Sequence, residues 1–186
     1  MQDELLIRRA QRGDADAFEQ LLLEHQKNVY NLCYRMAGNP DDAMDLSQET
    51  FLRAWRCLDQ YQFAPAFSTW LYRLCSNICI DFLRRRRRQQ TVPLTFEDAD
   101  GEEQTYAVPD AQPLPEEQVE LKLTRETLAA AMAQLLPEHR AVLQLRVVNE
   151  MSYEQIADVL DIQIGTVKSR LSRARNQLKK ILERGN

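Results

Sequence analysis

The sequence predicts an all-α protein made of two small helical domains that are joined by a flexible acidic linker. Residues 1–90 are helix-patterned, with Pro40 and Pro65 as their only prolines, and hold thirteen basic and twelve acidic residues. Residues 91–120 hold nine acidic residues, four prolines and no Lys or Arg, which is too polar and too broken to bury a core. Helical periodicity returns in residues 121–186. The one strand-like run, residues 91–95, lies beside the linker.

The overall composition sets limits on these domains. The chain has 186 residues, 44% of them hydrophobic, and a net charge of -4, which suits one ordinary domain or two small ones. No apolar run approaches the roughly 20 residues needed to span a bilayer. The N-terminus also lacks the basic, apolar and small-residue order of a signal peptide. We therefore expect a cytoplasmic protein with no direct membrane insertion.

Apolar spacing predicts three helices in the first domain, over residues 14–36, 41–58 and 68–88. Gly38, Asn39 and Pro40 end the first of them. In the second helix we expect the packing residues to be Met44 or Ala43, together with Phe51, Leu52 and Trp55. The polar residues that this leaves outside form an acidic surface: Asp42, Asp45, Gln48, Glu49 and Arg53.

Aromatic residues and a run of arginines surround the start and end of the third helix. The loop 59–67 is rich in aromatic residues, and five consecutive arginines, residues 84–88, close the helix. This combination suggests single-stranded nucleic acid, whose bases stack on rings while cations hold its backbone. Packing is the alternative for the aromatics, and it is favoured for Trp70 and Phe82. The arginines could instead be a solvated helix end stabilised by the helix dipole.

The second domain contains a predicted helix-turn-helix. Ser152 and Gln155 have the spacing of a capping box, which marks the start of a helix. A short connector, residues 161–165, leads to a second helix. The apolar positions expected to face inward are Ile156, Ala157, Val159 and Leu160 in the first helix and Val167, Leu171, Ala174, Leu178 and Ile181 in the second.

The outer face of that second helix is strongly basic. Residues 162–186 contain seven Lys or Arg and one acidic residue, although the chain as a whole is acidic. Cations mixed with Ser, Thr and Asn suit phosphates and base edges, so we predict DNA binding. The alternative is an ordinary amphipathic helix with a solvated basic side.

The cysteines and histidines do not point to a catalytic or metal centre. Cys33, Cys57, Cys75 and Cys79 lack the paired spacing of a zinc or redox site. Cys75 and Cys79 would share a helix face and could bind metal or sense oxidation if other ligands were recruited, but we favour buried, reduced thiols. We also find no glycine-rich phosphate loop and no nucleophile with a base. The sequence therefore predicts no metal, no cofactor, no catalytic residue and no enzyme activity.

Three strings together carry a resemblance to a known family. They are DAFEQLLLEHQKNVYNLCYRMAGNPDDAMDLSQETFLRAW, FSTWLYRLCSNICIDFLRRRRR and LLPEHRAVLQLRVVNEMSYEQIADVLDIQIGTVKSRLSRAR. In this order, separated by one acidic linker, they resemble an extracytoplasmic-function (ECF) sigma factor of bacterial RNA polymerase, in the sigma-70 family. YNLCYRMAGN and FSTWLYRL are most similar to the sigma-W branch.

The resemblance implies a role for each part. Residues 1–90 correspond to sigma region 2, which docks on core polymerase and recognises and melts the minus 10 element. Residues 91–120 are the linker, which threads toward the RNA exit path in the family or serves as a plain tether. Residues 121–186 correspond to region 4, which reads the minus 35 element, and there is no separate region 3 domain.

The resemblance also implies the site residues. Those matching the docking surface for the beta-prime clamp helices are Asp45, Leu46, Gln48, Glu49 and Phe51. Those matching the minus 10 site, where a base is flipped into a pocket, are Tyr61, Phe63, Phe67, Ser68, Thr69, Trp70, Arg73, Asn77, Arg84 and Arg85. Those matching the minus 35 recognition helix are Thr166, Lys168, Ser169, Arg170, Ser172, Arg173 and Arg175.

The expected partners are core RNA polymerase (beta-prime clamp helices and beta flap), promoter DNA and a membrane-anchored anti-sigma factor. The expected function is to direct transcription initiation of a stress or envelope-response regulon. A free-standing transcription regulator is the main alternative, with residues 1–90 as a sensor or dimerisation domain, and it predicts tight duplex binding without polymerase. An RNA-binding or metal-dependent enzyme is a third.

Overall fold

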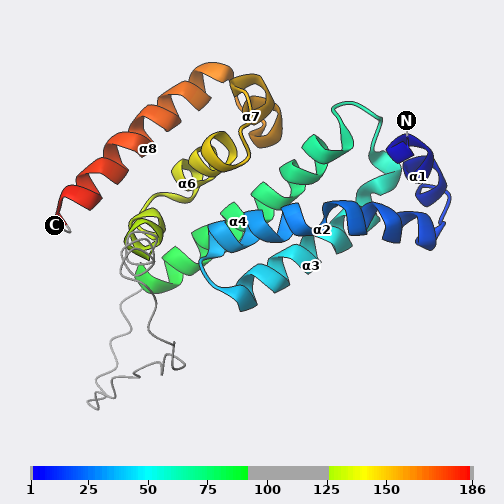
Figure 1. Cartoon of the computed structure of the whole chain (residues 1–186), viewed down its shortest axis with the longest axis horizontal. Helices are drawn as coiled ribbons and strands as arrows, with labels where there is room; N and C mark the ends of the chain where they lie inside the picture. Colours follow the sequence, from blue (N-terminus) through cyan, green and yellow to red (C-terminus); the bar gives the residue numbers. More distant parts are fainter. Residues whose placement is uncertain (1, 92–125, 185–186) are drawn as a thin grey trace, which may run out of the picture.

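The computed structural model describes residues 2–91 and 126–184, and all their regular elements are helical (Figure 1). The N-terminal half holds α1 (Gln2–Ala10), α2 (Ala15–Ala37), α3 (Pro40–Cys57), the short 3-10 helix η1 (Leu58–Gln60) and α4 (Phe67–Thr91). The C-terminal half holds a helix at 126–133, α6 (Pro137–Leu143), the π-helical η2 (Gln144–Val148), α7 (Tyr153–Leu160) and α8 (Ile164–Arg184). The predicted all-α fold class is confirmed. The predicted linker and strand-like run lie outside the described residues, apart from Thr91.

The helices begin and end where local hydrogen bonds predict. Asp14 caps α2 by accepting a hydrogen bond from the Ala17 N–H at 3.0 Å. Gly38 adopts a left-handed conformation (φ 89°) and ends the helix by donating its N–H to the Tyr34 carbonyl at 2.8 Å. Asn39 then caps α3, and Pro40 occupies the first position, where a missing N–H costs nothing. The three helices predicted in the first domain are confirmed, with small shifts at their ends.

The core of the N-terminal half forms where α2, α3 and α4 pack together. On α3 the buried residues are Ala43, Leu46, Ser47, Thr50, Phe51 and Ala54. The prediction that Leu52 and Trp55 pack inward was wrong, because they are 52% and 38% exposed. Leu52 lies about 100° around the helix from buried Phe51, and so on the neighbouring face. Trp55 lies only about 40° from Phe51 and packs against Phe18, with ring centroids 4.9 Å apart and planes tilted by 55°, but part of its ring stays exposed.

The C-terminal half contains the predicted helix-turn-helix, α7 followed by α8. The capping box is present: the Ser152 Oγ accepts from the Gln155 N–H at 3.2 Å, and the Gln155 Oε1 accepts from the Ser152 N–H at 2.8 Å. The buried positions of the two helices are Ile156, Val159, Leu160, Val167, Leu171 and Ala174, while Ala157, Leu178 and Ile181 are half-buried. The predicted inward faces are therefore confirmed, although α8 begins at Ile164, inside the expected connector.

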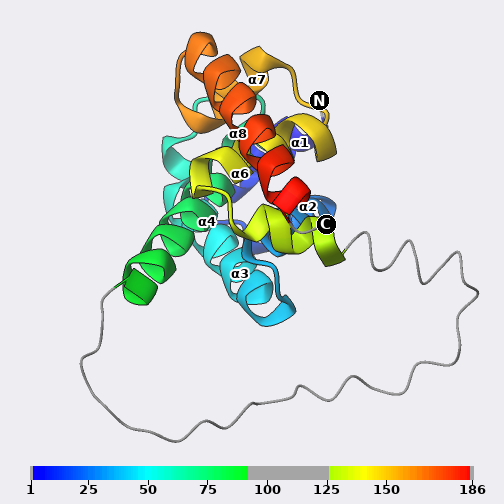
Figure 2. The same ribbon diagram turned by 90° about the vertical axis from the view of Figure 1, so that its left-hand side faces the viewer.

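The two halves pack directly against each other. α4 lies along α7 and α6, and α2 touches α6 and η2 (Figures 1 and 2). Arg140 is buried in this interdomain contact, where its Nη1 donates to the Met36 carbonyl at 2.6 Å. Desolvation lowers the pKa of the Arg140 guanidinium. None of the described helices is long and apolar enough to cross a membrane.

Candidate nucleic-acid interface

The outer face of α8 presents cations and short polar side chains to solvent. Val167, Leu171 and Ala174 anchor the helix from below. Of the residues predicted to read the minus 35 element, those fully exposed are Lys168, Ser169, Ser172, Arg173 and Arg175, while Thr166 and Arg170 are half-buried. The structure thus brings all seven predicted residues into the first 12 residues of α8, slightly more than three turns. Such a face can place cations on phosphates and hydrogen-bonding groups on base edges.

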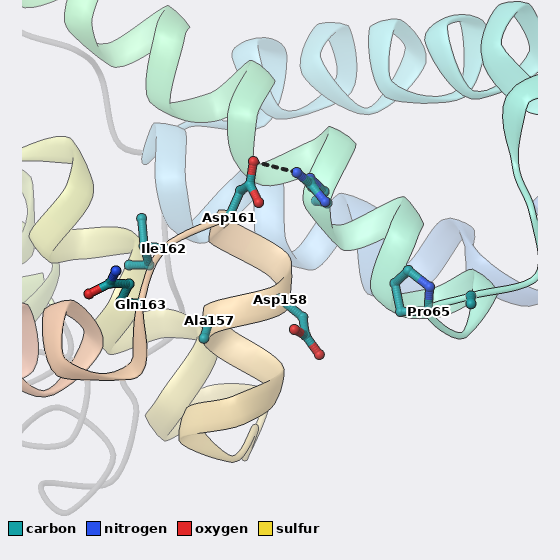
Figure 3. Close-up of a pocket in the computed structure, with 8 residues that line it drawn as sticks. Pro65, Ala157, Asp158, Asp161, Ile162 and Gln163 are labelled. Atoms are coloured by element: carbon teal, nitrogen blue, oxygen red, sulfur yellow. Dashed lines mark ion pairs between the residues drawn. The ribbon is translucent and has the colours of Figure 1, made fainter.

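A tight turn fixes the position of α8 relative to α7. Asp161 adopts a left-handed conformation (φ 54°, ψ 50°), which Asp tolerates better than most residues. The Ile162 N–H bonds back to the Ala157 carbonyl at 3.1 Å, which closes the turn. The turn also leaves the Asp161 carboxylate 75% exposed and directed at the N-terminal half (Figure 3).

The loop before α4 is held by a cluster of aromatic rings. The Tyr61 centroid lies 5.4 Å from Phe63, 5.7 Å from Phe67 and 5.2 Å from Trp70. The Tyr61 hydroxyl donates to the Pro65 carbonyl at 2.7 Å, and the Arg8 guanidinium lies 4.4 Å above the Phe63 ring. Tyr61 and Phe67 are only 5% and 6% exposed. Packing therefore accounts for these two rings, and contact between them and a base would require the loop to rearrange.

The remaining predicted minus 10 residues differ in accessibility. Ser68, Thr69, Trp70 and Arg73 are half-buried, while Asn77, Arg84 and Arg85 are exposed along α4. Two of these cations are held by acids from the C-terminal half. Arg73 Nη2 lies 2.6 Å from Asp161 Oδ2, and Arg84 Nη2 lies 2.5 Å from Glu138 Oε1. These two interdomain ion pairs place carboxylates beside side chains that are predicted to contact the minus 10 element.

A groove separates the loop before α4 from α7. Its lining residues are Ala64, Pro65, Arg73, Ala157, Asp158, Asp161, Ile162 and Gln163. Figure 3 shows Asp158 and Asp161 on α7 and at its end, with Pro65 across the groove. The first helix of the helix-turn-helix therefore covers part of the surface that is predicted to capture the minus 10 element.

The predicted polymerase-docking residues on α3 divide into two groups. Asp45, Gln48 and Glu49 are exposed, whereas Leu46 and Phe51 are buried and support the helix from behind. The exposed face also contains Met44 and Leu52, which the sequence analysis did not assign to the surface. Their spacing of eight residues, about two helical turns, with Gln48 between them, was the available signal.

Comparison with known proteins identifies both halves. Residues 21–89 match the family described as Sigma-70 region 2, and residues 125–178 match Sigma-70, region 4. The chain is 33% identical to the ECF RNA polymerase sigma factor SigW of Bacillus subtilis (strain 168), over 95% of this chain and 94% of that protein. It is 37% identical to the RNA polymerase sigma-H factor of Pseudomonas aeruginosa (strain PAO1), over 98% of this chain and 94% of that protein.

Solved structures agree with this assignment. The structure of CnrH in complex with the cytosolic domain of CnrY aligns with a TM-score of 0.69 and 25% identity, over 100% of both chains. The sigma factor RpoE in complex with the anti-sigma factor NepR from Bartonella quintana aligns with a TM-score of 0.61 and 27% identity, over 89% of this chain and 96% of that chain. The chain therefore belongs to the sigma-70 family and is an extracytoplasmic-function sigma factor of RNA polymerase.

Proposed function

We propose that this sigma factor reads the minus 35 element with α8, captures the minus 10 element with α4 and the loop before it, and docks on core polymerase through α3. The observation that carries the proposal is the exposed cationic face of α8, supported by the buried apolar face of a helix-turn-helix. One arginine bound bidentately to a base supplies about 1–3 kcal/mol of discrimination. Phosphate contacts by the others set the register and make binding salt-dependent.

The exposed face of α3 supports a protein-docking role. Met44 and Leu52 are apolar and half exposed, and Asp45, Gln48 and Glu49 surround them with polar groups. Apolar residues inside a polar rim are typical of protein interfaces. The proposed partner of this face is the beta-prime clamp-helix region of polymerase, with the beta flap as the partner of the C-terminal half. Because polymerase works in the cytoplasm, we expect the protein there.

An anti-sigma factor is the proposed regulator. CnrH, which shares this fold, was solved in complex with the cytosolic domain of CnrY, and RpoE was solved in complex with the anti-sigma factor NepR. Binding across both halves would hold α4 against α7 and keep the paired cations from DNA. Anchoring of that regulator in a membrane is part of the proposal, as is control of a stress or envelope-response regulon.

Binding both promoter elements requires the interdomain contact to open. Arg73 and Arg84 are engaged by Asp161 and Glu138, so the DNA contacts proposed for them need an exchange of partners. Both ion pairs are partly exposed, so breaking them to form contacts with DNA costs little free energy. We therefore expect polymerase binding or DNA to separate the halves.

Run-off transcription tests the proposal. A library of promoter fragments is transcribed by bacterial core polymerase with and without the protein, and the transcripts are sequenced. We expect specific starts that share two upstream motifs only when the protein is present. The variant Arg173→Ala should lose starts, whereas Lys180→Ala, an exposed cation about two turns farther along α8, should retain them. Absence of starts, with tight duplex binding by the protein alone, would instead support a free-standing regulator.

A further inference from the structure

Three cysteine thiols meet in the core of the N-terminal half. Cys33 comes from α2, and Cys75 and Cys79 lie one turn apart on α4. The Cys33 Sγ lies 3.4 Å from the Cys75 Sγ and 3.8 Å from the Cys79 Sγ, and all three sulfurs lie within 4.8 Å of one another. Each residue is fully buried. The fold thus supplies the third ligand that the pair on α4 lacked in the sequence analysis.

The separations between the sulfurs suit one metal ion at their centre. A metal–sulfur bond of about 2.3 Å places neighbouring sulfurs of a trigonal or tetrahedral site roughly 3.8–4.0 Å apart. The two Cys33 distances, 3.4 and 3.8 Å, approach that spacing without any backbone movement. The cysteines are free, so each can act as a ligand.

The donor set selects the kind of ion. Among the His, Cys, Asp and Glu residues that the structure describes, the three cysteines are the only members of this cluster, so every donor in it is a sulfur. Thr50, which neighbours Cys33, donates its hydroxyl hydrogen to the Leu46 carbonyl at 2.7 Å, and its oxygen is neutral and therefore a weaker ligand than a thiolate. Thiolates prefer soft ions such as Cu(I) and Zn(II), whereas Mg²⁺ and Ca²⁺ need oxygen ligands. We propose that Cys33, Cys75 and Cys79 form a binding site for one soft d10 metal ion, Cu(I) or Zn(II).

Metal binding at the cluster would displace the protons of the three thiols. Each thiol that becomes a ligand releases its proton to solvent, and no electron is transferred. Three thiolates leave one negative charge with Zn(II) and two with Cu(I).

A bound ion would link α2 to α4. α4 also holds the residues predicted to capture the minus 10 element and ends in the arginine run. A ligand that binds only the folded domain stabilises it by mass action. The expected consequence is a more heat-stable N-terminal half, with the middle of α4 held more firmly against α2.

Metal titration of the full-length protein tests the site. The starting protein is Cys57→Ser, which removes the half-buried thiol outside the cluster and leaves the three others. It is purified reduced and metal-free under anaerobic conditions, and then titrated with Cu(I) or Zn(II) against a chromophoric chelator. We expect one equivalent of at least one ion to bind, and the thermal midpoint to rise.

Matched variants identify the ligands. Cys33→Ser and Cys79→Ser in the same background should each lose the bound equivalent and the rise in thermal midpoint, while circular dichroism checks that they are folded. X-ray absorption of the loaded starting protein gives the ligand count without any change in the cluster, and three sulfurs are expected. The inference is overturned if neither ion binds, if the bound ion has fewer than three sulfur ligands, or if a folded Cys33→Ser protein binds equally well.

Discussion

The interdomain ion pairs provide the sharpest test of how the two halves cooperate. Asp161→Asn and Glu138→Gln each remove one carboxylate and keep the shape of the side chain. Asn is the suitable replacement at Asp161, since it also tolerates the left-handed conformation found there. If α7 restrains access to α4, the double variant should open more readily and bind single-stranded minus 10 DNA more tightly.

The size of the effect follows from exposure. The side chains of Arg73 and Asp161 are 37% and 75% exposed, so their pair contributes about 0.5 kcal/mol. Arg84 reaches one Glu138 oxygen with both Nε (2.8 Å) and Nη2 (2.5 Å), and that carboxylate is 22% exposed, so its pair contributes nearer to 1 kcal/mol. The pairs lie about 16 Å apart along α4, so their contributions add. The total of about 1.5 kcal/mol is roughly a tenfold shift toward the open form.

The assay measures binding of a fluorescent single-stranded oligonucleotide that carries the minus 10 sequence found by run-off transcription. When the closed form dominates, apparent affinity rises in proportion to the open fraction, so the double variant should bind about tenfold more tightly. Small-angle X-ray scattering should show a larger radius of gyration.

The matched control is Asp158→Asn with Glu183→Gln. It removes the same charge, and Asp158 lines the same groove, while Glu183 pairs only within α8, with Lys179. An equal gain in the control would refute the reasoning, as would an unchanged affinity and radius in the double variant.

Further predictions concern stability and the minus 35 contact. Ser152→Ala should cost about 1 kcal/mol by removing the cap of α7, measured by chemical denaturation. Leu145→Ala, in the core, should cost about 2–5 kcal/mol, whereas exposed Val147→Ala should stay within about 0.5 kcal/mol. Arg173→Ala should reduce the dependence of promoter-fragment affinity on salt by about one ion if it contacts a phosphate; loss of discrimination at one base pair with an unchanged salt slope would contradict that role. The Ala17 N–H and then Arg9 lower the pKa of Asp14, so its stabilisation is present near neutral pH and lost as pH falls through that lowered pKa. The difference in thermal midpoint between the protein and Asp14→Ala should therefore shrink in acid. A difference that stays constant with pH would contradict the idea that the ionised Asp14 carboxylate stabilises the helix.

Local chemistry made much of the fold predictable. Capping residues such as Ser152 and Asn39 act on backbone groups within three positions of themselves, so their effect is visible in the sequence. The inward face of α8 follows from periodicity alone. For the same reason none of the predicted minus 35 residues is buried: five are exposed, and Thr166 and Arg170 are half-buried.

Features that depend on contacts between distant segments were harder to predict. The sequence analysis placed Leu52 among the packing residues of α3, and only packing against α2 and α4 decides that it lies outside. Tyr61 is buried because rings from the loop and α4 converge on it. The sulfurs of Cys33 and Cys79 lie close together although the two residues are 46 positions apart in the sequence, and no local sequence pattern predicts such a contact. A search for apolar residues at 3.6 residues per turn also does not predict the π-helical η2.

The continuity of α4 has a consequence for promoter geometry. This single helix of 25 residues contains both the aromatic end at Phe67 and the arginine run, so it acts as a rigid ruler about 37 Å long. If α4 binds the minus 10 element as proposed, the distance from a captured base to the phosphates held by the arginines is fixed by the number of residues between them. One residue inserted between Asn77 and Arg84 would lengthen α4 by about 1.5 Å and rotate the arginines by about 100° around its axis. Under the proposed function, the spacing of residues along α4 would then help to determine which DNA the protein can melt.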